Sequence, residues 1–309
     1  MRATQFQLDL GKDAFAHVYA WLPDGEPRAC LQIVHGMAEH AGRYARLAAA
    51  LAADGIAVYA QDLPGHGRSV RSADELGHVA DSGGWQLTLA AINAVRAAIE
   101  HRHAGLPLFM LGHSRGSYLL QHYLVEHGGG LAGAVLSASC ADMGPLRAIG
   151  LVLVRAEALW FGRRRRSVVG EALAFKDFNR RFRPTRTAFD WLSRDAAEVD
   201  RYLRDPLCGF RCSTAMWIEL LEAGAALRAP RRLARIPKSL PVLLINGTAD
   251  PACRGAAGAR GLERLYREAG LTDVTLKLYA EGRHELLNDL CRDEVTADLR
   301  AWIGTHLSA

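Results

Sequence analysis

The chain has 309 residues, of which 50% are hydrophobic and 23% charged, as in a globular protein that buries a large core. Its formal net charge is +5, and apart from one arginine run the basic residues are spread along the chain. This spread argues against a nucleic-acid partner, which would require a focused basic face. No apolar stretch reaches the length of about 18 residues that a membrane span requires. The first ten residues lack the apolar core of a signal peptide, so we expect a cytoplasmic protein with reduced cysteines.

Strand and helix patterns alternate in the first part of the chain. Short continuous apolar runs predict buried strands, and longer segments with apolar residues at helical spacing predict helices. Alternation of this kind predicts βαβ units around a mostly parallel sheet flanked by helices. The expected strands cover residues 15–22, 29–34, 56–60, 106–111 and 131–138, and the expected helices cover residues 43–54, 85–103 and 115–127.

This alternation is interrupted over residues 141–235, where helical segments mixing apolar and basic residues accumulate without a convincing strand pattern. We therefore predict an α/β core of residues 1–140 and 236–309, with a helical cap (lid) of residues 141–235 inserted at the C-terminal edge of the sheet. The patterns that resume after the insertion predict strands 240–246 and 274–279 and helices 255–269 and 285–306.

An apolar run ends at Gly112-His113-Ser114-Arg115-Gly116, after which a helical pattern begins. This is G-x-S-x-G in the strand–turn–helix setting that a nucleophile elbow requires. The turn is so sharp that a side chain larger than hydrogen at Gly112 or Gly116 would press on it. We therefore expect Ser114 to present its hydroxyl beside the positive N-terminus of the following helix, as a nucleophile.

An acyl-transfer triad needs an acid and a histidine after the serine, each on a loop that follows a later strand. Asp250 lies just past the strand pattern of residues 240–246, and His284 lies just past that of residues 274–279. The resulting order of serine, acid and histidine is the order expected of α/β-hydrolases. Asp142 is a rival acid, because it follows the strand after the elbow and can reach such a histidine from there.

An oxyanion hole needs two backbone N–H groups directed at the developing negative charge. One is expected from Arg115, which immediately follows the nucleophile. The other is expected from the loop after an early strand, where we choose the N–H of Met37, with His35 and Gly36 shaping the loop.

At this point the chain resembles a known family. Motifs along nearly its whole length are similar to those of the monoacylglycerol lipase/lysophospholipase-like branch of the α/β-hydrolases, a serine aminopeptidase-type group, and the motif in the insertion resembles bacterial members. These motifs are the elbow, His35-Gly36-Met37-Ala38-Glu39-His40, Arg43-Tyr44, Asp62-Leu63-Pro64-Gly65-His66-Gly67-Arg68-Ser69, Arg204-Asp205-Pro206-Leu207-Cys208-Gly209-Phe210, Asn246-Gly247-Thr248-Ala249-Asp250 and Gly282-Arg283-His284-Glu285-Leu286-Leu287-Asn288.

The resemblance implies a role for each matching residue. The implied nucleophile, acid and base are Ser114, Asp250 and His284, which agrees with the reading from the residues and prefers Asp250 to its rival. The implied oxyanion donors are the backbone N–H groups of Met37 and Arg115. Four further family positions are interpreted as loop scaffolding: Glu39, His40, Asp62 and His66.

Two positions depart from the family pattern. In the family an apolar residue usually follows the nucleophile, but this chain has Arg115 there. Gly-Gly often closes the elbow in the family, but this chain has Gly116-Ser117. The Arg115 backbone can still donate to an oxyanion. Its guanidinium could favour an anionic acyl or head group, or could pair with a carboxylate of the cap, so the departure bears on the choice of substrate.

We expect a serine hydrolase that cleaves carboxylic esters through an acyl-enzyme, with monoacylglycerols or lysophospholipid-like acyl esters as its small-molecule substrates. The alternative within enzymes is a short-chain carboxylesterase or thioesterase with a shallow acyl pocket. A different class is a ligand-binding protein on a hydrolase scaffold without turnover, against which an intact triad argues. Acyl-chain length, head group and oligomeric state are left open by the sequence.

One stretch concentrates positive charge, because an apolar helical pattern over residues 150–160 is followed by Arg163-Arg164-Arg165-Arg166. In one interpretation this helix rests on an anionic membrane surface and feeds acyl chains to the nucleophile. In the other, which we favour, a cap helix packs its apolar face on the core and a solvated basic loop follows it. The two interpretations are compatible.

Two other motif matches fail on their context. Residues 128–133 satisfy G-x-G-x-x-G, but they follow a helix and precede a strand, which is the reverse of a dinucleotide site. His101 and His103 have no cysteine or carboxylate cluster beside them, so a polar helix end is expected there. We therefore expect neither a metal nor a cofactor.

Overall fold

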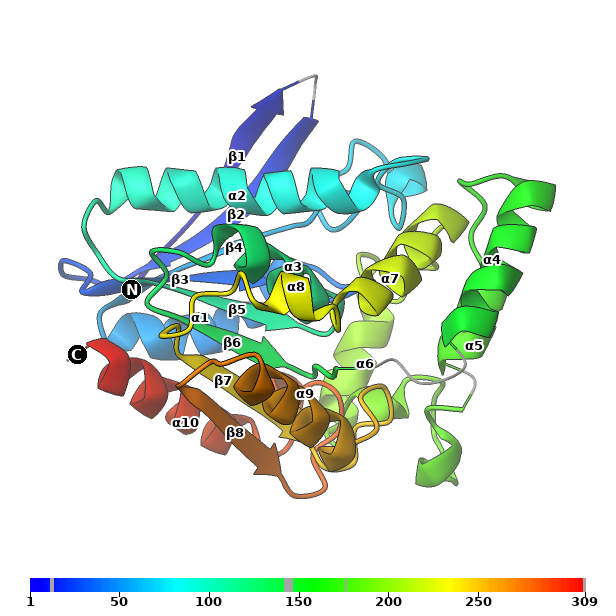
Figure 1. Ribbon diagram of the computed structural model, residues 1–309. Coiled ribbons are helices and arrows are strands. Elements are labelled where there is room, and N and C mark those ends of the chain that lie inside the picture. The colour runs from blue at the N-terminus through cyan, green and yellow to red at the C-terminus, as the bar shows by residue number, and fades with distance from the viewer. Residues whose placement is uncertain (12–13, 142–146, 176, 308–309) are drawn as a thin grey trace.

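The computed structural model describes residues 1–11, 14–141, 147–175 and 177–307. Within these ranges the chain forms an eight-stranded sheet in the order β1-β2-β4-β3-β5-β6-β7-β8 (Figure 1). Neighbouring strands from β4 to β8 pair in parallel, while β2 pairs antiparallel with both β1 and β4. The strands are β1 (Arg2–Gly11), β2 (Ala14–Leu22), β3 (Ala29–Val34), β4 (Ile56–Gln61), β5 (Leu108–His113), β6 (Gly133–Ser137), β7 (Val242–Gly247) and β8 (Val274–Tyr279).

Helices cover both faces of the sheet, which explains why β3 to β7 are mostly apolar and buried at every position. On one face, α1 (Ala45–Ala53) and α10 (Arg292–Leu307) share a core with the sheet. On the other face lie α2 (Gly84–Arg102), α3 (Arg115–His127) and α9 (Ala256–Glu268) (Figure 1). A site is therefore expected beyond the carboxyl ends of the parallel strands.

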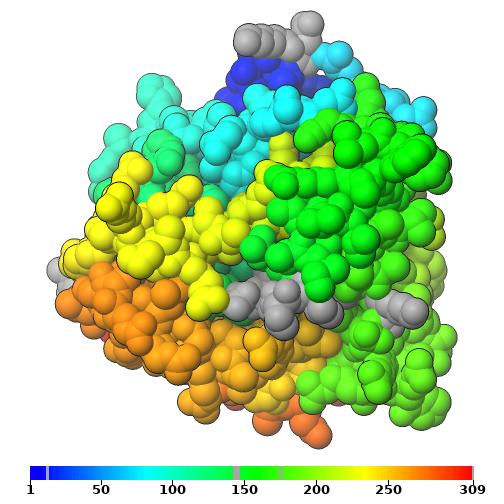
Figure 2. Space-filling view, turned by 45° about the vertical axis from the view of Figure 1, so that its right-hand side comes forward, coloured from blue at the N-terminus to red at the C-terminus, as the bar shows by residue number. Residues whose placement is uncertain are grey.

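The described residues between β6 and β7 form helices joined by turns and loops, and the outer helices α4 and α5 stand beyond the carboxyl ends of the strands (Figure 1). In the space-filling view the green part of this segment forms the right-hand side of the molecule, and its yellow part lies toward the middle and left (Figure 2). Its described residues include only an isolated β-bridge, between Arg166 and Ser213. Its elements are α4 (Arg147–Phe161), α5 (Val168–Phe175), η3 (Arg180–Phe182), η4 (Asp190–Leu192), α6 (Ala196–Arg204), α7 (Thr214–Ala226) and α8 (Pro230–Leu233).

The α/β-hydrolase fold is confirmed, but two elements differ from the prediction. The sequence reading missed β1, in which Phe6, Leu8 and Leu10 alternate with polar residues because only one side of this edge strand is partly buried. The helix expected over residues 285–306 is a short 3-10 turn, η5 (Leu286–Asn288), followed by α10. The Asp289 carboxylate lies between them and accepts from backbone N–H groups on both sides, so it competes with a continuous helix.

The outer surface of α4 and α5 is apolar. Within the described ranges, no helix is both long enough and apolar enough to cross a bilayer. The large exposed apolar side chains of these two helices are Ile149, Val152, Leu153, Leu159, Trp160 and Phe161 in α4, and Val168 and Leu173 in α5.

Candidate active site

Ser114 lies in the sharp turn between β5 and α3. Its backbone has φ of +52° and ψ of −121°, a conformation that non-glycine residues rarely adopt and that marks a strained elbow. A Cβ atom at Gly112 would lie 2.6 Å from the Gly116 carbonyl oxygen, and one at Gly116 would lie 2.1 Å from the Val34 carbonyl oxygen. Both glycines are therefore required by close backbone contacts, as the motif predicts.

The structure brings the three predicted side chains into one hydrogen-bonded chain. His284 Nε2 lies 2.9 Å from Ser114 Oγ, and His284 Nδ1 lies 3.0 Å from each carboxylate oxygen of Asp250. With the Nδ1 proton donated to Asp250, Nε2 can accept the serine proton. The acid follows β7 and the histidine follows β8, as their spacing in the sequence predicts. The rival acid, Asp142, lies outside the described residues.

Burial and charge act in opposite directions on this pair. Burial disfavours the charged form of His284, but the Asp250 carboxylate beside it outweighs this effect and holds the His284 pKa above its usual value. Burial also disfavours the charged form of Asp250, but His284 and a backbone N–H of residue 252 hold the Asp250 pKa below its usual value. Asp250 is thus kept as a carboxylate that favours the imidazolium form of the histidine.

A buried ion-pair network joins the loop after β3 to the loop that carries His284. Glu39 accepts from the Gly36 N–H at 2.6 Å, and Arg43 donates to Glu39 at 2.8 Å. The same guanidinium binds Glu285 through both carboxylate oxygens, at 2.7 and 2.6 Å. The reading of the sequence placed Glu39 in the scaffold but gave no function to Arg43 or Glu285. Buried paired charges on motifs so far apart in the chain become visible only once the fold is known.

The scaffold residues hold the loops around this network. Asp62 accepts from the backbone N–H groups of Ala41 and Arg68, at 2.8 and 2.6 Å. The His35 ring accepts from the Leu63 N–H at 2.9 Å, and burial lowers the His35 pKa to about 3, which keeps the ring neutral. Both residues thus connect the loops that follow β3 and β4.

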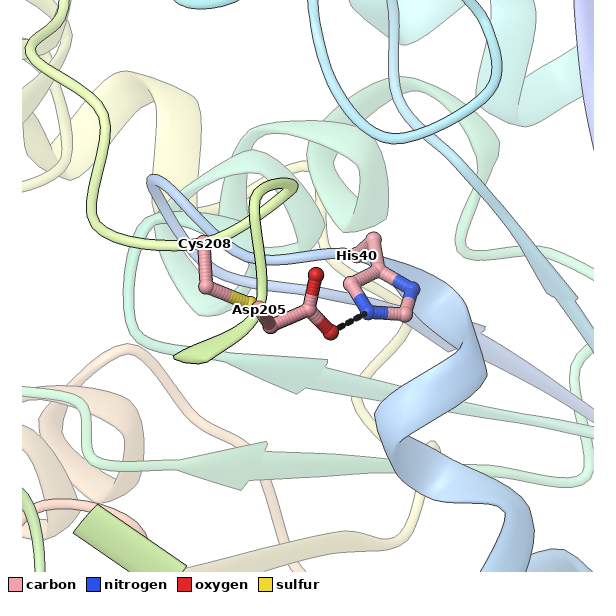
Figure 3. Close-up of side chains that lie close together, drawn as sticks. All are labelled: His40, Asp205 and Cys208. Atoms are coloured by element: carbon pink, nitrogen blue, oxygen red, sulfur yellow. Dashed lines mark hydrogen bonds and ion pairs between the residues drawn. The ribbon is translucent and has the colours of Figure 1, made fainter. Parts of the chain in front are cut away.

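His40, Asp205 and Cys208 lie close together between the core loop and the residues after α6, and they form a candidate group of metal ligands (Figure 3). His40 Nδ1 accepts from the Gly42 N–H, so Nε2 carries the proton and donates to Asp205 at 3.0 Å. Burial raises the pKa of the Cys208 thiol, which opposes the thiolate that a metal needs. The residues fit a structural tether better than a metal site.

A pocket opens in front of Ser114. Met37 and Arg115, the two predicted oxyanion donors, line it together with the serine, and its lining also includes the carboxyl groups of Glu39 and Glu285. The segment between β6 and β7 contributes an apolar wall, whose side chains include Val154, Leu173, Phe175, Trp217, Leu220 and Leu221. The pocket therefore combines a few polar groups with a largely apolar lining beside the serine.

The comparisons with known proteins agree with this geometry. Residues 25–291 match the family Hydrolase_4, described as serine aminopeptidase, S33. The monoacylglycerol lipase of Mycolicibacterium smegmatis is 30% identical, with 93% of this chain and 92% of the relative aligned. The monoglyceride lipase of Mus musculus is 29% identical over 94% of this chain and 86% of its own.

Among solved structures, a thermostable carboxyl esterase from Bacillus coagulans superposes with a TM-score of 0.90 at 24% identity, covering 99% of each chain. At this identity the likeness supports the α/β-hydrolase fold alone. The family match spans most of the chain, and relatives of similar length align along nearly all of it. The chain therefore belongs to the serine aminopeptidase S33 (Hydrolase_4) family and is a carboxylic ester hydrolase.

Proposed function

We propose that this hydrolase cleaves monoacylglycerols or similar long-chain acyl esters through an acyl-enzyme formed on Ser114. The hydrogen-bonded chain from Ser114 through His284 to Asp250 carries the proposal, because it joins a nucleophile, a base and an acid at the mouth of a partly apolar pocket. Monoacylglycerol lipases among the relatives support the same substrate class.

In the proposed reaction, His284 takes the proton of Ser114 as the oxygen attacks the ester carbonyl. The carbonyl oxygen becomes an oxyanion held by the N–H groups of Met37 and Arg115. The tetrahedral intermediate collapses, the bond to the alcohol breaks, and His284 protonates the leaving alcohol. Water deprotonated by the same histidine then attacks the acyl-enzyme and releases the fatty acid and free Ser114.

We assign the acyl chain to the apolar wall of the pocket and the glycerol group to the part of its lining that includes Glu39 and Glu285. Residues 141–235 then act as a cap that shields the acyl chain from water and sets the depth of the pocket. Val154 of α4 and Trp217 of α7, which line the pocket, support this role.

We also propose that the cap touches anionic membrane surfaces. Leu159, Trp160 and Phe161 are 87%, 84% and 66% exposed at the end of α4, and the arginine run 163–166 follows directly. An apolar surface beside a cationic one suits the interface of an anionic bilayer. Co-sedimentation with phosphatidylglycerol vesicles, but not with phosphatidylcholine vesicles, is expected, and W160S/F161S should weaken it. If the wild-type protein and the W160S/F161S variant both stayed in the supernatant with phosphatidylglycerol vesicles, this contact would be excluded.

The substrate class is tested by kcat/KM on 4-nitrophenyl esters and 1-monoacylglycerols from C2 to C18, with Ser114→Ala as the control. A rise toward long chains, with turnover of monoacylglycerols, is the expected result. A maximum at C2–C4 without monoacylglycerol turnover would instead favour a short-chain carboxylesterase, or a thioesterase if acyl thioesters are cleaved faster. Absence of all turnover, together with failure of Ser114 to react with a fluorophosphonate, would indicate a non-catalytic scaffold.

A further inference from the structure

The ring nitrogens of His284 bond to two residues of the core, Ser114 and Asp250. Hydrogen bonds at the two nitrogens fix where the imidazole points, but they resist a tilt of the ring only weakly, because they lie close to the axis of that tilt. Two rings pack against the imidazole. The centre of the His113 ring, at the end of β5, lies 5.1 Å away, and that of the Trp191 ring, in η4 of the cap, lies 5.0 Å away with its plane at 46°.

Trp191 is itself held tightly in the cap. Its ring stacks on Phe175 of α5, with the ring centres 5.5 Å apart and the planes at 19°, and meets the edge of Phe178 at 4.9 Å. Its backbone N–H donates to the side-chain oxygen of Asn179 at 2.8 Å. Only 5% of the residue is exposed. The indole is therefore a fixed surface against which the imidazole rests.

The main chain supports the contact between the two rings. The Arg283 guanidinium donates to the carbonyl oxygens of Asp190 and Ser193, at 2.5 and 3.0 Å. The N–H of Glu285 donates to the Leu192 carbonyl oxygen at 2.8 Å. Residues on both sides of the base thus bond to carbonyl groups on both sides of the tryptophan, so the backbones that carry the two rings are fixed to each other.

We propose that Trp191 is a positioning residue for the base, whose ring keeps the His284 imidazole in the orientation that directs Nε2 at Ser114. The inference rests on the proposed function, in which His284 takes the serine proton, and it gives the cap a role besides enclosing the acyl chain. The base becomes an imidazolium when it takes that proton. The indole then lies within the distance of about 6 Å over which an aromatic ring attracts a cation.

A role as a wall of the acyl pocket is the alternative to be separated from positioning. Trp191 lines the pocket, and so does Trp217 of α7, which is also 5% exposed. The Trp217 ring contacts Phe175 at 5.7 Å, but within the described part of the chain it makes no ring contact with His284. Loss of a wall residue should raise KM for long acyl chains, whereas loss of a positioning residue should lower kcat for esters of any length.

The kinetic experiment compares Trp191→Met with Trp191→Phe. The Trp191 indole nitrogen has no hydrogen-bond partner among the described residues, so the phenylalanine variant keeps a ring and loses no such bond. The readouts are kcat for 4-nitrophenyl acetate and the rate at which diisopropyl fluorophosphate modifies Ser114. In the latter reaction the serine oxygen bonds to phosphorus, fluoride leaves and His284 takes the proton, with no long acyl chain involved.

Trp191→Met should lower both rates roughly 10–100-fold, because the base is misplaced. Trp191→Phe should keep both within about threefold of the wild-type values, because an aromatic ring remains beside the imidazole. Trp217→Met should mainly raise KM for long-chain esters. Near-ultraviolet circular dichroism checks that each variant is folded. If Trp191→Met does not fold, Phe175→Leu removes the ring stacked on the indole and should lower both rates in the same way, by a smaller factor.

Nuclear magnetic resonance gives a readout that needs no turnover. The proton on His284 Nδ1 is bonded to Asp250, and its signal is identified by its absence from His284→Gln. In Trp191→Met this proton should exchange with water faster than in the wild-type protein, and in Trp191→Phe it should exchange at close to the wild-type rate.

The outcomes separate the inference from the proposed function. If Trp191→Met keeps the wild-type reaction rates and proton exchange and only raises KM for long esters, the inference is overturned and the proposed function stands. Equal losses in Trp191→Met and Trp191→Phe would also overturn it, because an aromatic ring would not restore the base. If the wild-type protein hydrolyses no ester and proton exchange still speeds up only in Trp191→Met, the inference is supported and the proposed function fails.

Discussion

Gly116 has no room for a side chain, because a Cβ atom there would lie 2.1 Å from the Val34 carbonyl oxygen. Neither partner can move without opening the elbow, since one belongs to β3 and the other begins α3. The chain thus uses glycine at this position for the approach of two backbones, and the strained Ser114 conformation depends on that approach.

Gly116→Ala should lower the free energy of unfolding by at least about 2 kcal/mol and reduce activity further, because the backbone must shift at the nucleophile. Gly261→Ala in α9 is the control, since a Cβ atom there meets nothing within 4 Å. That substitution should leave stability equal or raise it by up to about 1 kcal/mol. Urea denaturation measures both, and equal stabilities of the two variants would contradict the steric account.

The pH dependence of catalysis should report His284. The base must be neutral to accept the Ser114 proton, and the Asp250 carboxylate raises the His284 pKa above 6.5. Activity should therefore be lost as pH falls through a value above 6.5. Asp250→Asn should move this limb of the kcat/KM profile to lower pH and reduce kcat by about 10⁴-fold. If the acidic limb of the profile stayed at the same pH in Asp250→Asn, the group that titrates would not be His284.

At the scale of elements, Arg43 joins two loops that belong to opposite ends of the chain. It bridges Glu39, on the loop after β3, and Glu285, which directly follows His284. The loops that carry the predicted oxyanion donor Met37 and the predicted base His284 are thus joined by the same guanidinium. Loss of the arginine leaves two buried carboxylates facing each other without a cation.

Arg43→Met should therefore cost about 3–5 kcal/mol of stability and also lower kcat, because both loops lose their common anchor. The control is Arg46→Met, which removes a half-exposed guanidinium from Glu198 while Arg201 stays paired with the same carboxylate. It should cost less than about 1 kcal/mol. Thermal unfolding and steady-state kinetics of the two variants decide between an anchoring network and ordinary surface ion pairs.

Local patterns predicted most elements of the core, because β3 to β7 are buried on both faces and read as nearly continuous apolar runs. The edge strand β1 was missed because its alternation buries one side only in part. The spacing after β7 and β8 was enough to place Asp250 and His284 near Ser114. The contact of Arg43 with Glu285 was not predictable, since it joins residues separated by 242 positions and depends on the order of strands in the sheet.

At the scale of the whole molecule, several buried histidines couple folding to pH. Burial lowers the pKa of His35 to about 3 and of His113 to about 4, and it lowers the His66 pKa well below its usual value. These groups take up protons near pH 6.5 in the unfolded chain but only at lower pH in the folded protein. His284, whose pKa is raised, acts in the opposite direction over a window above 6.5.

Because the His284 window lies above 6.5, the lowered pKa values of these histidines act below it, and the free energy of unfolding should decrease as pH falls from about 6.5 toward 4. His113→Gln/His66→Gln should flatten this part of the curve, apart from any general loss of stability. Urea denaturation at a series of pH values measures the slope. A stability that rises on acidification over this interval would contradict lowered pKa values for these histidines in the folded protein.

The central claim is that Ser114 carries an acyl group from a long-chain ester during turnover. The most direct measurement is the intact mass of the protein after rapid acid quenching of its reaction with 1-monoacylglycerol, followed by peptide mapping. An added fatty acyl mass on the peptide that contains Ser114, absent from Ser114→Ala, is the predicted result. The claim would be contradicted if Ser114 stayed unmodified during steady turnover of the ester and also failed to react with a fluorophosphonate while turnover continued.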